Sequence, residues 1–230
     1  MPDIRIKGRD GEFSGYLATP AGGAGPGVVL IQEIFGVNKV MRDLADGFAR
    51  QGYVVVCPDI FWRQEPGIQL TDQTEKEWAR AFELYKGFDE AKGIEDLVAT
   101  LAYVRGIKGC TGKVGTVGYC LGGKLAYLMA TRSDANANVG YYGVGIGGAL
   151  GEAAKIKAPL MLHIATADEY CKPDEQATIK AGLGSNKLAT LHSYEGKDHA
   201  FARVGGQHYD AAAAKQANDR TAHFFQQHLA

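Results

Sequence analysis

The chain has 230 residues, in which 25 lysines and arginines balance 26 aspartates and glutamates. This length suits a single domain over residues 1–230, and the balanced, scattered charges exclude the electrostatic footprint of a protein that binds nucleic acid or anionic membranes. The first seven residues lack the apolar core of a signal peptide, and no apolar run reaches the roughly 20 residues that span a bilayer; we therefore expect a cytoplasmic protein, which we take to be a monomer.

Apolar runs and amphipathic segments alternate through the first half of the chain. Asn38 has the residue type of a helix cap, and the apolar positions that follow it share one face as far as Arg50. The elements predicted here are strands at 12–19 (part of a hairpin) and 27–32, a helix at 38–50, a strand at 53–57, and helices at 73–86 and 89–105.

The second half continues the same alternation. Its predicted elements are a strand at 114–117, a helix at 124–130, strands at 138–142, 159–164 and 188–194, and a closing helix at 210–229. Strands that are apolar throughout and separated by helices predict an α/β fold, with a mostly parallel sheet covered by helices on both faces. In such a sheet, ligands bind at the carboxyl ends of the strands.

The sequence GYCLGG at residues 118–123 lies between a predicted strand and a predicted helix. It resembles the nucleophile elbow of α/β-hydrolases, a strained turn that only small neighbours tolerate and that exposes its central residue. That central residue is Cys120. A cysteine here predicts acyl transfer through a thioester, provided that another group deprotonates the thiol.

Two further strands are followed by residues that suit a catalytic triad. Asp168 comes just after the strand at 159–164, and His199 lies in the polar loop after the strand at 188–194. The order nucleophile, acid, histidine is that of α/β-hydrolases and differs from the orders in chymotrypsin and subtilisin. Cys120, Asp168 and His199 are therefore the candidate catalytic residues.

Glu169, Glu195 and Asp198 compete with Asp168 for the role of the acid. Asp198 adjoins His199, but side chains of consecutive residues seldom face each other in the geometry that an orienting hydrogen bond needs. Asp168 is preferred for this reason.

Two other patterns in the sequence concern cofactors. The sequence GVGIGG at residues 143–148 fits a dinucleotide fingerprint, but the segment at 149–157 is too short for the helix that should receive a pyrophosphate. The six histidines include no HExxH pair, and the four cysteines, without CxxC spacing, indicate reduced thiols. We therefore expect no metal and no cofactor.

Several motifs together resemble the dienelactone hydrolase (carboxymethylenebutenolidase) family over nearly the whole chain. They are QEIFG at 32–36, PD at 58–59, GYCLGG at 118–123, GYYG at 140–143 and HAFAR at 199–203. The resemblance implies an α/β-hydrolase fold and a cofactor-free Cys-His-Asp enzyme. Such an enzyme opens the lactone ring of dienelactones to maleylacetate in the bacterial degradation of aromatic and chloroaromatic compounds.

The resemblance also implies a role for each matching residue. The assignments are Cys120 as nucleophile, Asp168 and His199 as its partners, Glu33 as an auxiliary acid, Arg203 for the substrate carboxylate, the backbone N–H groups of Ile34 and Leu121 as oxyanion hole, and Phe35, Tyr85 and Tyr141 as substrate contacts. Glu33 closes an apolar strand, where an unpaired carboxylate is costly, and Arg203 is a suitable partner. A substrate carboxylate that competes for Arg203 would free Glu33 to take the thiol proton.

One position departs from the family pattern. The family has a second carboxylate-binding arginine, and an ungapped alignment places Trp78 at its position. Arg80 lies two residues away, which on a helix is a different face, so it substitutes only if the backbone shifts. Trp78 would otherwise enlarge an aromatic wall and favour other lactones or esters.

The sequence therefore predicts a cysteine hydrolase of an anionic lactone or ester, a small molecule. A broad carboxylesterase or thioesterase of neutral substrates is the first alternative. A non-catalytic binding protein on the same fold is the second, since fold does not fix function. A cation placed for the substrate carboxylate distinguishes the two enzymes, and thiol reactivity distinguishes both of them from the binding protein.

Overall fold

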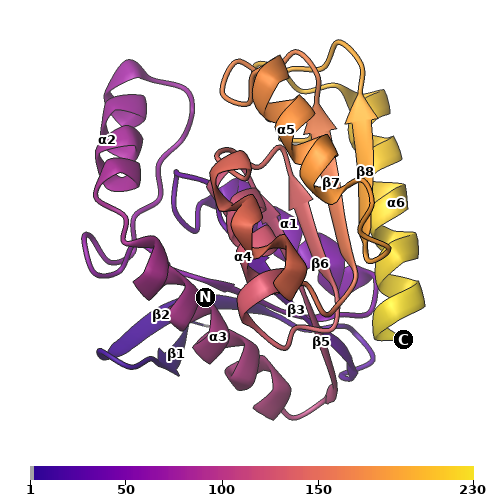
Figure 1. The fold of residues 1–230 in the computed structure, drawn as a ribbon. Helices are drawn as coiled ribbons and strands as arrows, with labels where there is room; N and C mark the ends of the chain where they lie inside the picture. Colours follow the sequence, from indigo (N-terminus) through magenta and orange to yellow (C-terminus); the bar gives the residue numbers. More distant parts are fainter. Residues whose placement is uncertain (1–2) are drawn as a thin grey trace. The chain divides into compact units, whose positions relative to one another are not determined.

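A computed structural model describes residues 3–230 (Figure 1). The chain forms two compact units, one that ends at Val114 and one that begins at Gly115. Each has its own strands, covering helices and buried core. A single domain over the full length stays a prediction.

The first unit contains four strands in the spatial order β1-β2-β4-β3. Their bounds are β1 Asp3–Lys7, β2 Glu12–Ala18, β3 Gly25–Ile31 and β4 Val54–Pro58. β1 and β2 form an antiparallel hairpin, β2 is antiparallel to β4, and β3 runs parallel to β4. The predicted hairpin and both predicted buried strands are confirmed.

Three helices complete this unit: α1 Lys39–Arg50, α2 Glu75–Lys86 and α3 Glu90–Gly106. Asn38 caps α1 as predicted, because its side chain accepts a hydrogen bond from the backbone N–H of Met41. α1 packs on β4, and α3 on β3 and β4. α2 stands out from the strands of this unit, after the long loop at 59–74 (Figure 1).

The second unit contains the parallel strands β5, β6, β7 and β8, in that spatial order. β5 spans Cys110–Tyr119 and so enters from the first unit, whereas β6 (Asn138–Tyr141), β7 (Leu160–Ala165) and β8 (Ala189–Tyr194) lie wholly within the second. The predicted strand at 114–117 lies within β5, and the other three predicted strands are confirmed to within a residue or two. β6 and β7 are buried as expected, but β8 is only partly buried, with Tyr194 its one buried residue.

The helices of the second unit are α4 Leu121–Arg132, η1 Gly147–Lys155, α5 Pro173–Leu183 and α6 Ala211–Leu229. A Cβ atom on Gly140 would lie 2.6 Å from the carbonyl oxygen of Gly123 in α4, while the next residue, Tyr141, reaches Thr221 in α6. Successive strand residues point to opposite faces, so α4 and α6 cover the two faces of this part of the sheet. The predicted α/β architecture is confirmed.

Three elements were not predicted: β1, η1 and α5. β1 has only a short alternation, with Ile4 and Ile6 between charged residues. α5 begins with Pro173 and two acidic residues, which are helix-start signals, but it buries few apolar side chains. η1 is a 3-10 helix that follows the GVGIGG sequence, in the place where a dinucleotide site would need a long α-helix.

His163 of β7 is the centre of a buried polar network that connects β6, β7, β8 and α6. Its Nδ1 atom is 2.7 Å from the hydroxyl of Tyr194, and its Nε2 atom is 3.0 Å from Oγ1 of Thr221. The Thr221 hydroxyl is in turn 2.6 Å from the hydroxyl of Tyr141. Burial lowers the pKa of His163 well below its usual 6.5, and the nearby His192 and Arg220 lower it further.

This network predicts a pH-dependent stability. Folded His163 stays neutral, whereas the unfolded chain takes up a proton as the pH falls below about 6.5, so the free energy of unfolding should decrease from that pH downward. A single such group contributes up to about 1.4 kcal/mol per pH unit. His163→Gln should flatten the slope of stability against pH, measured by denaturant unfolding between pH 7 and pH 5. The exposed His223→Gln should leave the slope unchanged, and an unaltered slope in His163→Gln would contradict this account.

Candidate active site

Cys120 occupies a sharp turn between β5 and α4. Its backbone has φ 56° and ψ −115°, a conformation that residues other than glycine rarely adopt. A Cβ atom on Gly118 would lie 1.9 Å from the carbonyl oxygen of Gly122, and one on Gly123 would lie 2.4 Å from that of Tyr141. The turn therefore requires glycine on both sides of Cys120, as the elbow pattern predicts.

The same turn places the thiol at the N-terminus of α4. Cys120 is the cap residue of this helix, and Leu121 is its first residue. The first N–H groups of a helix have no intrahelical acceptor, and the helix dipole favours negative charge there. The backbone of Leu121 is thus a suitable donor to an oxyanion formed beside Cys120.

Asp168 and His199 form the hydrogen bond that a triad requires. Nδ1 of His199 lies 2.9 Å from Oδ2 of Asp168, and both side chains are buried. The other carboxylate oxygen of Asp168 accepts hydrogen bonds from the backbone N–H groups of Tyr170 (2.8 Å) and Cys171 (3.2 Å). These bonds fix the carboxylate, which in turn orients the imidazole.

The other candidate acids have different surroundings. Asp198 accepts a hydrogen bond from the backbone N–H of His199 at 2.7 Å, and its other oxygen lies 3.6 Å from Nδ1 of His208. Glu169 is hydrogen-bonded to Tyr170, and Glu195 is exposed at a turn. The imidazole of His199 is therefore oriented by Asp168, the preferred candidate.

The imidazole of His199 also interacts with the thiol of Cys120. Burial by itself would lower the pKa of His199, but the charge of the Cys120 thiolate, the hydrogen bonds to Asp168 and Cys120, and the charge of Asp168 together raise it to about 10. Since Nδ1 is bonded to Asp168, Nε2 is the ring atom left to serve Cys120.

Aromatic residues that the sequence analysis missed surround this imidazole. The rings of Tyr142 and Tyr170 meet that of His199 edge-on, with centroids 5.1 and 4.9 Å away, and Phe201 packs on Tyr142. Tyr142 has φ 37°, an uncommon value that follows the end of β6. Its position within GYYG was the one available signal.

Tyr141, which was expected to contact the substrate, has another role. It is fully buried, and its hydroxyl binds Thr221 at 2.6 Å and Asn218 at 3.0 Å on α6. The strand alternation turns Tyr141 toward α6 and leaves Tyr142 beside His199. Tyr142, and not Tyr141, is thus the tyrosine beside the imidazole, and a substrate contact by Tyr141 stays a prediction.

Glu33, Ile34 and Phe35 directly follow strand β3 in the first unit, and all three are buried. The ring of Phe35 meets that of Trp78 edge-on at 4.9 Å, and Trp78 stacks on Phe82 at 5.6 Å. Trp78 thus belongs to an aromatic cluster with Phe35 and Phe82, and its effect on substrate choice stays a prediction.

Arg80 and Tyr85 lie on the same helix, α2, in different surroundings. The guanidinium of Arg80 contacts Glu65 at 2.6 Å and Glu83 at 2.7 Å. Its charge is thus already matched by two carboxylates, and the binding of a substrate carboxylate by Arg80 stays a prediction. Tyr85 is 38% exposed.

Arg203 lies in the second unit, four residues after His199. It is buried, and its backbone N–H donates to the carbonyl oxygen of Ala200 at 2.9 Å. Ala200 has φ 62°, so the loop turns sharply between the two functional candidates.

Two negative observations apply to residues 3–230, the described part of the chain. In this part of the chain, no group of three or more His, Cys, Asp or Glu side chains is arranged to hold a metal ion. None of the helices there combines the length and apolarity needed to cross a membrane.

Comparison with known proteins decides the family. Residues 13–229 match the dienelactone hydrolase family. The chain belongs to this family. A carboxymethylenebutenolidase of Pseudomonas putida is 40% identical over 222 residues, which cover 96% of this chain and 94% of that protein. A protein of Azospirillum brasilense, provisionally named a carboxymethylenebutenolidase, is 52% identical over 232 residues, which cover 100% of both chains.

A solved structure agrees with this assignment. The crystal structure of a provisionally named dienelactone hydrolase from Klebsiella pneumoniae has a TM-score of 0.88 at 25% identity and covers 98% of both chains. The predicted family and α/β-hydrolase fold are therefore confirmed, and this dienelactone hydrolase family member is a hydrolase of ester or lactone bonds.

The electrostatics of this hydrolase predict how His199 titrates. Cys120→Ser removes the sulfur whose negative charge raises the pKa of His199. That pKa should then fall from about 10, because burial lowers it and Asp168 alone is left to raise it. The His199 ring resonances, followed by NMR against pH, measure the change. Cys110→Ser is the matched control and should leave them unchanged. The same pKa in Cys120→Ser and in the wild type would show that Cys120 does not raise the pKa of His199.

Proposed function

We propose that this chain opens the lactone ring of dienelactone to maleylacetate, with Cys120, His199 and Asp168 as its catalytic triad. The observation that carries the proposal is the buried 2.9 Å hydrogen bond between Asp168 and His199, whose imidazole also interacts with the thiol in the strained elbow. Full-length relatives named carboxymethylenebutenolidase support the choice of substrate.

The proposed reaction has two acyl-transfer steps. The thiolate of Cys120 attacks the lactone carbonyl, and the resulting oxyanion accepts hydrogen bonds from the backbone N–H groups of Leu121 and Ile34. Collapse of this intermediate breaks the ring C–O bond and forms a thioester. The leaving group is an enolate, whose charge is delocalised by conjugation, and it becomes the ketone of maleylacetate when it takes up the proton that Glu33 removed from the thiol.

His199 completes the cycle. Its imidazole, held by Asp168, takes a proton from water, and the resulting hydroxide attacks the thioester carbonyl. The second tetrahedral intermediate expels the Cys120 thiolate and releases the carboxylic acid, and His199 passes the proton it took from water to the thiolate, which restores the thiol.

The proposed substrate is anionic, and two buried charged residues are assigned to it. Arg203 binds the substrate carboxylate, and Glu33 takes the thiol proton once that carboxylate is bound, as the family resemblance implies. Both side chains are almost fully buried, Glu33 being 3% and Arg203 7% exposed. Buried charges require partners, so neither residue is a solvated surface group.

A second candidate function follows from α2. The cluster of Arg80, Glu65 and Glu83 carries net negative charge, and Trp78 contributes an aromatic surface where the family has an arginine. These features favour neutral or bulkier esters and support a broad carboxylesterase or thioesterase. Steady-state kinetics on cis- and trans-dienelactone beside p-nitrophenyl acetate distinguish the two functions: a much higher kcat/KM for either dienelactone supports the first, and a preference for the neutral ester supports the second.

The nucleophile provides the most direct test. Cys120→Ala should abolish hydrolysis without loss of folding, because alanine fits the elbow but offers no attacking atom. Iodoacetamide should label Cys120 and remove activity in parallel. Cys110→Ala is the control, since Cys110 begins a 10-residue strand and so lies about 30 Å along it from Cys120. Wild-type turnover by Cys120→Ala would rule out the triad mechanism.

Substrate charge provides an independent test. Arg203→Ala should raise KM for dienelactone strongly but change hydrolysis of p-nitrophenyl acetate little, because the neutral ester does not use this cation. Glu33→Gln should slow acylation by the anionic substrate even at saturation, and the double variant should be non-additive. The control is Arg132→Ala, a surface arginine paired with Glu152. Equal losses on both substrates in Arg203→Ala would indicate a structural role and favour the esterase.

A further inference from the structure

Gln32, the residue between β3 and Glu33, has a side chain that is completely buried and bonded at both ends. Its Oε1 accepts from the backbone N–H of Ile60 at 3.3 Å, and its Nε2 donates to the carbonyl oxygen of Glu33 at 3.2 Å. The amide can adopt only this orientation, since a backbone N–H must meet the oxygen and a carbonyl must meet the nitrogen.

The Glu33 carbonyl belongs to the same peptide group as the N–H of Ile34. Peptide groups are planar, and the peptide bonds of the described residues are trans, so this C=O and this N–H point in opposite directions within one rigid plane. A hydrogen bond that holds the oxygen therefore also sets the direction of the N–H. That N–H is the donor assigned to the oxyanion.

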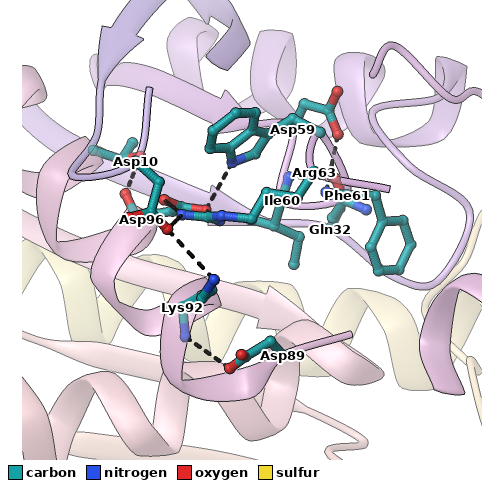
Figure 2. Close-up of polar contacts among 11 residues, drawn as sticks. Asp10, Gln32, Asp59, Ile60, Phe61, Arg63, Asp89, Lys92 and Asp96 are labelled. Carbon is teal, nitrogen blue, oxygen red and sulfur yellow. Dashed lines mark hydrogen bonds and ion pairs between the residues drawn. The ribbon is translucent and has the colours of Figure 1, made fainter. Parts of the chain in front are cut away.

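The other end of the Gln32 amide contacts a firmly anchored loop, shown in Figure 2. This loop comprises residues 59–67. Asp59 accepts hydrogen bonds from the backbone N–H groups of Phe61 at 3.0 Å and Gly67 at 2.7 Å, and so ties the two ends of the loop together. Arg63 is bound by both carboxylate oxygens of Asp96, a fully buried residue of α3. Ile60 thus lies in a segment with little freedom to move.

We propose that Gln32 is a positioning residue that aims the Ile34 N–H at the oxyanion of acyl transfer, with the anchored loop at 59–67 as its support. The inference rests on the proposed function, in which Ile34 is an oxyanion donor. Gln32 makes no bond to the reacting atoms itself. It acts by holding one peptide plane within the narrow tolerance that such a donor needs.

The test uses Gln32→Met, which keeps the length of the side chain but loses both hydrogen bonds. Because every acyl transfer passes through an oxyanion, kcat should fall about 10- to 100-fold for dienelactone and p-nitrophenyl acetate alike, somewhat less than when a whole donor is removed. The rate of Cys120 alkylation by iodoacetamide should stay at the wild-type value, because this displacement forms no oxyanion. Gln32→Glu, which keeps the oxygen that accepts from Ile60, is the second variant and should lose kcat in the same way.

Gln64→Met is the matched control. Gln64 lies in the same loop and donates one hydrogen bond to a backbone carbonyl, that of Leu84, at 2.9 Å. It should lose stability in thermal unfolding but keep kcat. Wild-type kcat in Gln32→Met and Gln32→Glu would overturn the inference, as would equal losses in hydrolysis and alkylation. Activity in Cys120→Ala would instead overturn the proposed function itself. The two failures are distinguishable, because an inactive Cys120→Ala together with wild-type kcat in the Gln32 variants would overturn the role of Gln32 alone.

Discussion

The close approach of α4 to the strands is the constraint on which the rest of the second unit depends. The carbonyl oxygen of Gly122 occupies the space where a side chain on Gly118 would be, and Gly123 lies against the carbonyl of Tyr141 in β6. No larger residue fits at either position without moving backbone. This contact presses the first turn of α4 against β5 and β6 and leaves Cys120 in its left-handed conformation, projecting from the turn.

Backbone strain in the second unit is concentrated around this site. The described non-glycine residues with positive φ are Cys120, Tyr142 and Ala200, and each follows a strand or adjoins His199. Strain of this kind costs about 1–3 kcal/mol per residue and persists only where the surroundings impose it. Here backbone hydrogen bonds impose it: Cys120 donates to Tyr141 at 3.1 Å, and Tyr142 donates to the carbonyl of His163 at 2.8 Å. The sheet therefore holds the reactive groups in conformations that an isolated loop would leave.

Buried polar groups support the reactive residues from behind. In the second unit, His163 and Thr221 link β7 to α6, and in the first unit Gln32 links the end of β3 to the loop after β4. A buried polar group stabilises only when all its partners are present, and it then allows one arrangement alone. These networks hold the neighbouring backbone in one geometry. Acyl transfer requires such a fixed geometry of the groups around its oxyanion.

The order of elements and the three triad candidates were predictable from the sequence because they depend on local patterns. A few consecutive residues are enough to recognise an apolar run, the cap at Asn38 or the glycines around Cys120. Short elements with weak patterns, such as β1 and α5, gave too little local signal and were found only in the structure.

Contacts between distant residues were decided by the tertiary structure. Asp168 and Asp198 were both candidates for the acid, and only the pairing of β7 with β8 brings the loop of Asp168 to the imidazole of His199. The same holds for the tyrosines at the end of β6, because strand alternation and α6 together turn Tyr141 toward Thr221 and leave Tyr142 beside His199. A sequence pattern specifies which groups can react, whereas packing decides which of them meet.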